Sequence, residues 1–177
     1  MEAMTLLDAL ADRQLFGRLA PFHDLGSWGA WMACLRALFA LPVPEADRVL
    51  YAHHTGREAP PASPPSEVYV CAGRRSGKTY MSALIATYLA TFRDYRPFLA
   101  PGERAMVLMV ACDREQAAIA LNYVRAFLAE VPMLAAMIEN ERADAIDLSN
   151  RTTLAVATCS YRSVRGITLA AAVCDEV

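Results

Sequence analysis

The chain has 177 residues, of which 55% are apolar and 20% are charged, so it is long enough for one hydrophobic core and suits a globular protein. A formal net charge of −2 excludes a broad electrostatic footprint for nucleic acid, so any contact with DNA must be local or come from other parts. No apolar stretch reaches the roughly 18 residues of a membrane span, and no basic segment precedes an apolar one at the N-terminus; we therefore expect neither secretion nor membrane spanning.

The first part of the chain, residues 1–56, is predicted to be a helical segment. Its apolar residues recur at three- and four-residue spacing. They include Trp28, Trp31, Met32, Leu35, Leu38 and Phe39. A further short helix is expected from Pro44. Residues 57–66 contain four prolines, which remove backbone donors and favour extended backbone, so a linker is predicted before a core of residues 67–177.

The core begins with an apolar run, residues 68–71, that leads into a loop of small and polar residues closing on Gly77, Lys78 and Thr79. We expect the run to be a strand. A helical stripe follows the loop. It consists of Met81, Leu84, Ile85, Tyr88, Leu89 and Phe92. Strand, loop and helix in this order predict a phosphate cradle, because clustered backbone N–H groups at a helix start bind polyphosphate.

The loop supplies most of the predicted site. The residues expected to bind phosphate are Gly73, Arg74, Arg75, Ser76, Gly77, Lys78 and Thr79. The Lys78 ammonium is expected to reach the β- and γ-phosphates, and the Thr79 hydroxyl to coordinate Mg²⁺. One position departs from the pattern GxxxxGK[ST], since Ala72 replaces the first glycine and resists a positive φ.

The adjacent arginines are candidates for stabilising the charge that develops during phosphoryl transfer. Arg75 is our catalytic candidate beside Lys78, although which guanidinium points at the phosphate stays open between Arg74 and Arg75. The alternative is a solvated pair of loop residues.

Downstream, residues 105–112 form a continuous apolar run that suits a buried strand. Asp113 and Gln116 resemble a capping pair that opens the next helix. Residues 144–148 and 152–158 flank a turn-rich break and predict a hairpin. This order of elements predicts a three-layer α/β fold with a mainly parallel sheet.

A second signal lies at residues 169–174, an apolar run that ends in Asp175 and Glu176. This pattern is typical of a Walker B strand, in which the first carboxylate holds Mg²⁺ and the second polarises the attacking water. We therefore assign Asp175 to the metal and Glu176 to catalysis. Taken alone, the pattern also fits a strand that simply leaves the core.

Three stretches together resemble the ATPase half of large terminase subunits, the DNA-packaging motors of tailed phages and prophages. They are residues 73–79, Ser163-Val164-Arg165-Gly166 and Val173-Cys174-Asp175-Glu176. The similarity extends from about Phe22 to the last residue. It implies an ATPase that uses ATP and Mg²⁺ to drive double-stranded DNA into a capsid in the host cytoplasm. The implied partners are the portal, the small terminase subunit and further copies in a ring.

The resemblance also implies an additional-strand P-loop fold, in which a later strand separates the Walker A and Walker B strands. Because the chain ends one residue after Glu176 and holds no acidic nuclease cluster, we expect a partial product with exposed strand edges and poor stability. Similarity to helicases in base binding makes Phe22, His23 and Trp28 candidates for the adenine pocket, with core packing as the alternative. Arg165 is a candidate for contacting DNA or for coupling, or a plain turn residue.

Two other functions stay open. One is a helicase-like or other additional-strand P-loop ATPase, and the other is a remnant that binds nucleotide without hydrolysing it.

Overall fold

The computed structural model describes residues 4–158 and 166–175. The α-helices of this part are α1 (Leu6–Ala11), α2 (Gly29–Leu38), α3 (Arg48–Thr55), α4 (Lys78–Phe92), α5 (Arg114–Glu130) and α6 (Pro132–Ala135). The strands are β1 (Ala105–Ala111), β2 (Ile138–Glu141), β3 (Ala145–Leu148), β4 (Thr152–Thr158) and β5 (Thr168–Asp175). Short 3₁₀ turns occur at η1 (Phe16–Arg18), η2 (Ala20–Phe22), η3 (Leu25–Trp28), η4 (Glu45–Asp47) and η5 (Arg96–Phe98).

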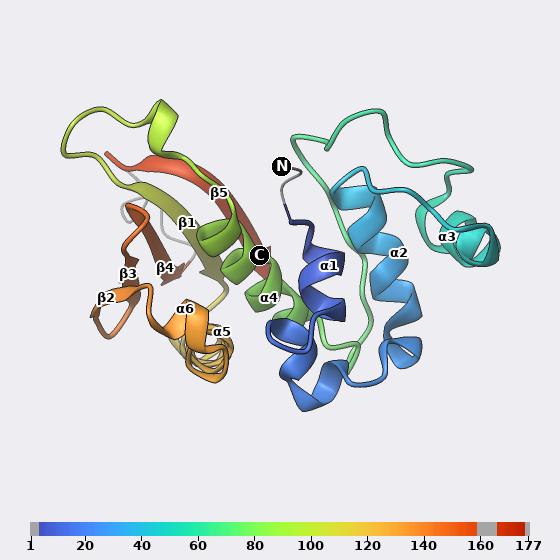
Figure 1. Ribbon diagram of the computed structural model, residues 1–177, viewed down its shortest axis with the longest axis horizontal. Helices are drawn as coiled ribbons and strands as arrows, with labels where there is room; N and C mark the ends of the chain where they lie inside the picture. The colour runs from blue at the N-terminus through green and yellow to red at the C-terminus, as the bar shows by residue number, and fades with distance from the viewer. Residues whose placement is uncertain (1–3, 159–165, 176–177) are drawn as a thin grey trace.

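The strands form one mixed sheet in the order β2-β3-β4-β1-β5 (Figure 1). Strand β1 pairs in parallel with both β4 and β5, whereas β3 pairs antiparallel with β2 and β4. The α/β class and the parallel core of the sheet are therefore confirmed. Ala111, at the end of β1, lies opposite Thr158 and Asp175, so the carboxyl ends of the parallel strands meet at one edge.

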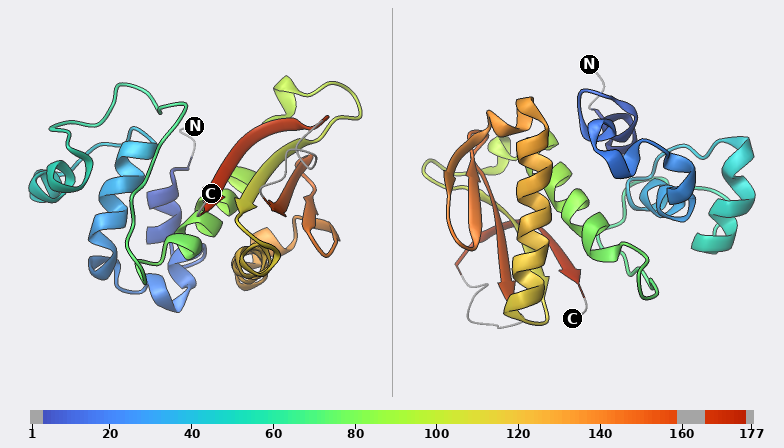
Figure 2. Two further views of the ribbon diagram at one scale, coloured as in Figure 1. Left: turned by 180° about the vertical axis from the view of Figure 1, so that it is seen from behind. Right: turned by 90° about the horizontal axis from the view of Figure 1, so that it is seen from below.

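Helices α4 and α5 pack on one face of this sheet, and the first helices of the chain pack beyond α4 (Figures 1 and 2). Alternate strand residues face α4 and α5, as the two-residue period of a strand requires. They include Val107, Met109, Leu154, Val156, Ala171 and Val173. The described part thus has three layers, namely the sheet, the pair α4 and α5, and the N-terminal helices.

The N-terminal helical segment shares its core with the rest of the chain. Phe16 is fully buried, with its ring centroid 5.9 Å from that of Phe92 and 6.0 Å from that of Phe127. The Tyr88 hydroxyl donates a hydrogen bond to the carbonyl of Met4 at 2.8 Å. These contacts join the first turns of the chain to both α4 and α5.

Several local expectations are confirmed. The Asp113 side chain accepts a hydrogen bond from the N–H of Gln116 at 2.8 Å and caps α5. The expected hairpin is formed by β3 and β4, and its turn places Arg151 in the left-handed region at φ 64°. The short strand β2 and the short helix α6 were not expected.

The strand expected at residues 68–72 is not formed. This segment is extended but unpaired, and Val68, Tyr69 and Val70 are all exposed. A strand needs a neighbouring ladder for its backbone groups. The segment instead lies alongside α2, where it lines a cavity together with Trp31 and Cys34.

Candidate phosphate-binding site

The loop before α4 has the backbone geometry of an anion cradle. Gly77 is the N-cap of α4 and lies in the left-handed region at φ 78°, and Arg75 lies there at φ 61°. Ser76, between them, has a negative φ, and its N–H donates to the carbonyl of Gly73 at 3.4 Å. The Ser76 N–H is thus used within the loop, and the left-handed Gly77 followed by the right-handed start of α4 is the pair of conformations that directs neighbouring N–H groups at an anion.

Lys78 and Thr79 are the first two residues of α4 and are partly buried, while Arg74 and Arg75 are exposed. The first turn of a helix leaves N–H groups without helical acceptors and carries the positive end of the helix dipole. Because α4 is 15 residues long, this dipole is fully developed. The loop and the helix start therefore favour a phosphate group at this point.

Two tryptophans from the N-terminal helical layer contact the loop. The indole N–H of Trp31 donates to the carbonyl of Ser76 at 2.7 Å. The ring of Trp28 lies against Gly77, so closely that a Cβ on Gly77 would approach it to 3.2 Å. The spacing of both tryptophans predicts a helical stripe, and Trp28 is also a candidate for the adenine pocket, but no local pattern indicates these contacts with the loop.

Asp175 is the last residue of β5, and it is buried, with 8% of its surface exposed. Strand β5 packs against α4, and its carboxyl end points toward the first turns of that helix in both Figure 1 and Figure 2. The predicted metal-binding carboxylate and the predicted phosphate loop thus lie at the same end of the α4–β5 pair. Glu176 and Arg165 lie outside the described residues.

The residues present suit a magnesium ion bound to a phosphorylated ligand. The Thr79 hydroxyl and the Asp175 carboxylate are hard oxygen donors, and Mg²⁺ in proteins commonly uses one or two such side chains and completes its shell with phosphate oxygens and water. Within residues 4–158 and 166–175, no group of three or more His, Cys, Asp or Glu side chains could hold a metal without such a ligand.

Of the three candidates for an adenine pocket, Phe22 and Trp28 pack in an aromatic cluster, whereas His23 is exposed. Phe22 is buried, and its ring centroid lies 5.4 Å from that of Trp28 and 5.5 Å from that of Tyr80. The indole N–H of Trp28 donates to the carbonyl of Pro21, and Nε2 of His23 contacts the carbonyl of Arg18. Burial raises the pKa of Tyr80 to about 12, in keeping with a dry aromatic cluster.

A cavity of about 690 Å³ lies beside the phosphate loop. Its wall combines α2, the end of α3 and the extended segment before the loop. Lining residues include Trp31, Cys34, Thr55, Val70, Ala72 and Ser76. None of Phe22, His23 and Trp28 lines it, and apart from Ala72 and Ser76 of the loop its lining residues had no expected role in nucleotide binding.

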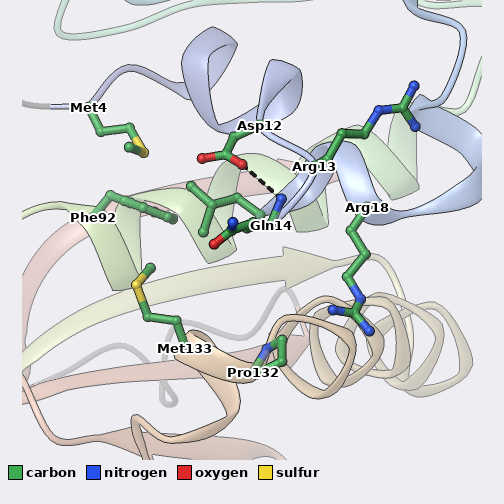
Figure 3. A pocket seen from close by; sticks show the side chains of 9 residues that line it. Met4, Asp12, Arg13, Gln14, Arg18, Phe92, Pro132 and Met133 are labelled. Carbon is green, nitrogen blue, oxygen red and sulfur yellow. Dashed lines mark hydrogen bonds between the residues drawn. The ribbon is translucent and has the colours of Figure 1, made fainter.

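A second cavity, of about 680 Å³, lies between the turn after α1, the end of α4 and α6 (Figure 3). Its lining is largely apolar and includes Phe92 and Met133, with Arg13 and Arg18 on the other side in Figure 3. The Asp12 carboxylate is occupied by a hydrogen bond from the backbone of Gln14 at 2.7 Å. The lining contains no residue of the predicted site.

No family model matches the chain, and the searches of curated proteins and of solved structures give no significant match. In the part of the chain that the structure describes, no helix is both long enough and apolar enough to cross a membrane.

Proposed function

We propose that this chain binds ATP with Mg²⁺ and forms the nucleotide-binding part of a DNA-packaging motor of the large terminase type. The single observation that carries the proposal is the left-handed Gly77, which caps α4 directly before Lys78 and Thr79. This geometry directs backbone donors at an anion and starts the helix with the lysine and the hydroxyl that a magnesium triphosphate needs.

The position of β5 supports the same proposal. Asp175 ends a strand that packs on α4, and parallel strands present functional carboxylates at their carboxyl ends. Mg²⁺ would neutralise charge on the phosphates when bound. Lys78 would hold the terminal phosphates, Thr79 and Asp175 would hold the ion, and Arg75 or Arg74 would face the developing charge.

The proposal of a DNA-packaging motor, beyond that of ATP binding, rests on the resemblance of the loop and of the sequence around Asp175 to large terminase subunits. In this proposal, the work is translocation of double-stranded DNA in the cytoplasm of a bacterial host, together with the portal, the small subunit and further copies in a ring. A helicase-like or other additional-strand ATPase would share the same nucleotide site.

A binding module without turnover is a second candidate, and one observation favours it. Residues 68–72 lie outside the sheet, so no strand ladder connects the phosphate loop to β5. Hydrolysis requires the phosphate loop and the metal-binding carboxylate to keep a fixed distance, whereas binding alone needs only the loop.

The test is thermal unfolding of the full 177-residue chain with and without millimolar ATP and Mg²⁺. We expect ATP to raise the midpoint and Lys78→Ala to abolish the shift, since binding only to the folded state stabilises it. Arg48→Ala, an exposed substitution at the start of α3, serves as control. A shift of full size in Lys78→Ala would contradict the proposal, and Lys78-dependent hydrolysis in a single-turnover assay would exclude the module without turnover.

A further inference from the structure

The phosphate loop has a contact that its own sequence does not supply. The Trp31 indole N–H reaches across 45 residues of chain and donates to the carbonyl of Ser76 at 2.7 Å. Trp31 lies on α2, which belongs to the N-terminal helical layer. Since residues 68–72 form no strand, this hydrogen bond is a main link between the loop and a regular element other than α4.

The bond fixes the direction of the next backbone donor. The peptide between Ser76 and Gly77 is trans, so its C=O and N–H point in opposite directions. With the carbonyl held by Trp31, the Gly77 N–H must point away from α2. It then joins the donors at the start of α4 that face a phosphate.

Trp28 restricts the same peptide from a second side. Its ring lies against Gly77, where a Cβ would come within 3.2 Å of the ring. The Ser76–Gly77 peptide is therefore contacted by Trp31 through its carbonyl and by Trp28 beside Gly77. Preorganised donors avoid the cost of ordering the loop during binding.

We infer that Trp31 is a positioning residue, which orients the Ser76–Gly77 peptide so that the Gly77 N–H binds the phosphates of the nucleotide. This inference rests on the proposed function. It also gives the N-terminal helical layer a role in the site, because movement of α2 would rotate the phosphate-binding peptide.

Trp31→Phe removes the donor and keeps an aromatic ring. Tyr88→Phe is the matched control, because it removes a side-chain hydrogen bond of 2.8 Å to a backbone carbonyl on the same side of α4 but away from the loop. Titration calorimetry would measure the dissociation constants of Mg-ATP and of inorganic tripolyphosphate for each full-length variant.

We expect Trp31→Phe to weaken binding of both ligands by the same factor, about five- to tenfold, as for one lost hydrogen bond. Tyr88→Phe should leave both constants unchanged. A purely structural role for Trp31 would lower the melting temperature without changing the constants of the folded protein, and that result would overturn the inference. Absence of binding by the unaltered chain would instead overturn the proposed function itself.

A second measurement observes Trp31 itself, so it does not depend on whether a Trp31 variant folds. The chain contains two tryptophans, so its NMR spectrum has two indole N–H signals, and Trp28→Phe assigns them. Saturating tripolyphosphate should shift the Trp31 indole signal, because the ligand polarises the peptide that this indole contacts. An unmoved signal at saturation would overturn the inference.

Discussion

At the scale of single residues, the loop contains two residues in the left-handed backbone region, and only one of them is of a type that favours this region. Gly77 and Arg75 both have a positive φ, but only glycine adopts that region without a steric cost. The strain at Arg75 is consistent with a functional loop, where the surrounding structure maintains an unfavourable backbone conformation. The two positions therefore respond differently to substitution.

We predict that Gly77→Ala lowers the free energy of unfolding by about 1–2 kcal/mol, the cost of a left-handed alanine. The added Cβ would also press on the Trp28 ring at 3.2 Å, so the loop must shift and nucleotide binding should be lost. Urea denaturation and calorimetry measure the two effects.

Gly102→Ala is the matched control for this substitution, because Gly102 also has a positive φ, 86°, but lies outside the loop, and a Cβ there meets nothing within 4 Å. It should lower stability by a similar amount and leave nucleotide binding unchanged. Loss of binding in both variants would refute the assignment of a special role to Gly77.

The sequence predicted part of this site and missed the rest for a physical reason. Gly77, Lys78 and Thr79 follow each other directly, and their chemistry is visible in their spacing. The contact between Trp31 and Ser76 spans 45 residues and depends on how α2 docks, which no local pattern encodes. The indole appeared only as an apolar residue on a helical stripe.

At the scale of elements, charged side chains join the amino ends of β1 and β4 to the carboxyl end of β3. Arg104, which precedes β1, donates to the carbonyls of Leu148 and Thr152 and to the hydroxyl of Thr153. Asp147 on β3 accepts a hydrogen bond from the same Thr153 hydroxyl at 2.7 Å. This network ties β1, β3 and β4 together at the edge of the sheet opposite the candidate site.

The carboxylate in this network should make stability depend on pH. Burial would raise the pKa of Asp147, but hydrogen bonds from Thr153 and Asn140, with the positive charges of Arg142 and Arg104, hold that pKa below its ordinary value. A lowered pKa in the folded state means stabilisation that is present above the unfolded value, near 3.9, and is lost as pH falls through the folded value.

We therefore predict that the melting temperature falls on acidification below about pH 5 and that Asp147→Asn flattens this fall. Circular dichroism melts at a series of pH values measure the slope. Glu58→Gln changes an exposed carboxylate and should keep the original slope. If the melting temperature of Asp147→Asn depended on pH as that of the unaltered chain does, Asp147 would not be the cause of the pH dependence.

The local signals of caps, turns and buried apolar runs predicted most elements, whereas the strand expected at residues 68–71 failed for lack of a partner strand. The cap at Asp113 and the turn around Arg151 are set by neighbouring residues, so their patterns sufficed. Residues 68–72 have the apolar composition of a strand, but a strand exists only where another offers a ladder. In this fold the segment lies against α2 instead.

At the scale of the whole molecule, one core extends from the first helix to the sheet. It joins residues of α1, α2, α4 and α5 with β1, β3 and β4. The expected boundary at residues 57–66 marks a linker in sequence, and the elements on both sides of it pack together. The segments should therefore unfold together.

We predict that Phe16→Ala destabilises the full chain by about 3–5 kcal/mol, because it leaves a cavity between α4 and α5. Both tryptophans lie before residue 57, so their fluorescence reports the N-terminal segment, whereas circular dichroism reports all helices. The two probes should give coincident urea transitions, before and after the substitution.

Val49→Ala is the control for this test, since Val49 is 84% exposed and its truncation should change stability by less than about 0.5 kcal/mol. Separate transitions from the two probes would show that the N-terminal segment folds independently and would contradict the shared core.

Strand β5 has a single neighbour among the described strands, β1, and it carries Asp175 at its end. Half of the backbone N–H groups of β5 therefore point away from β1 and have no acceptor in a neighbouring strand. Hydrogen–deuterium exchange should be much faster at these groups than in β1. Asp175, the proposed magnesium ligand, therefore lies on an edge strand of the sheet. If Mg-ATP binds as proposed, with its phosphates on Lys78 and its magnesium on Asp175, the ligand would connect α4 to this edge strand, and deuterium labelling of the β5 amides should become slower.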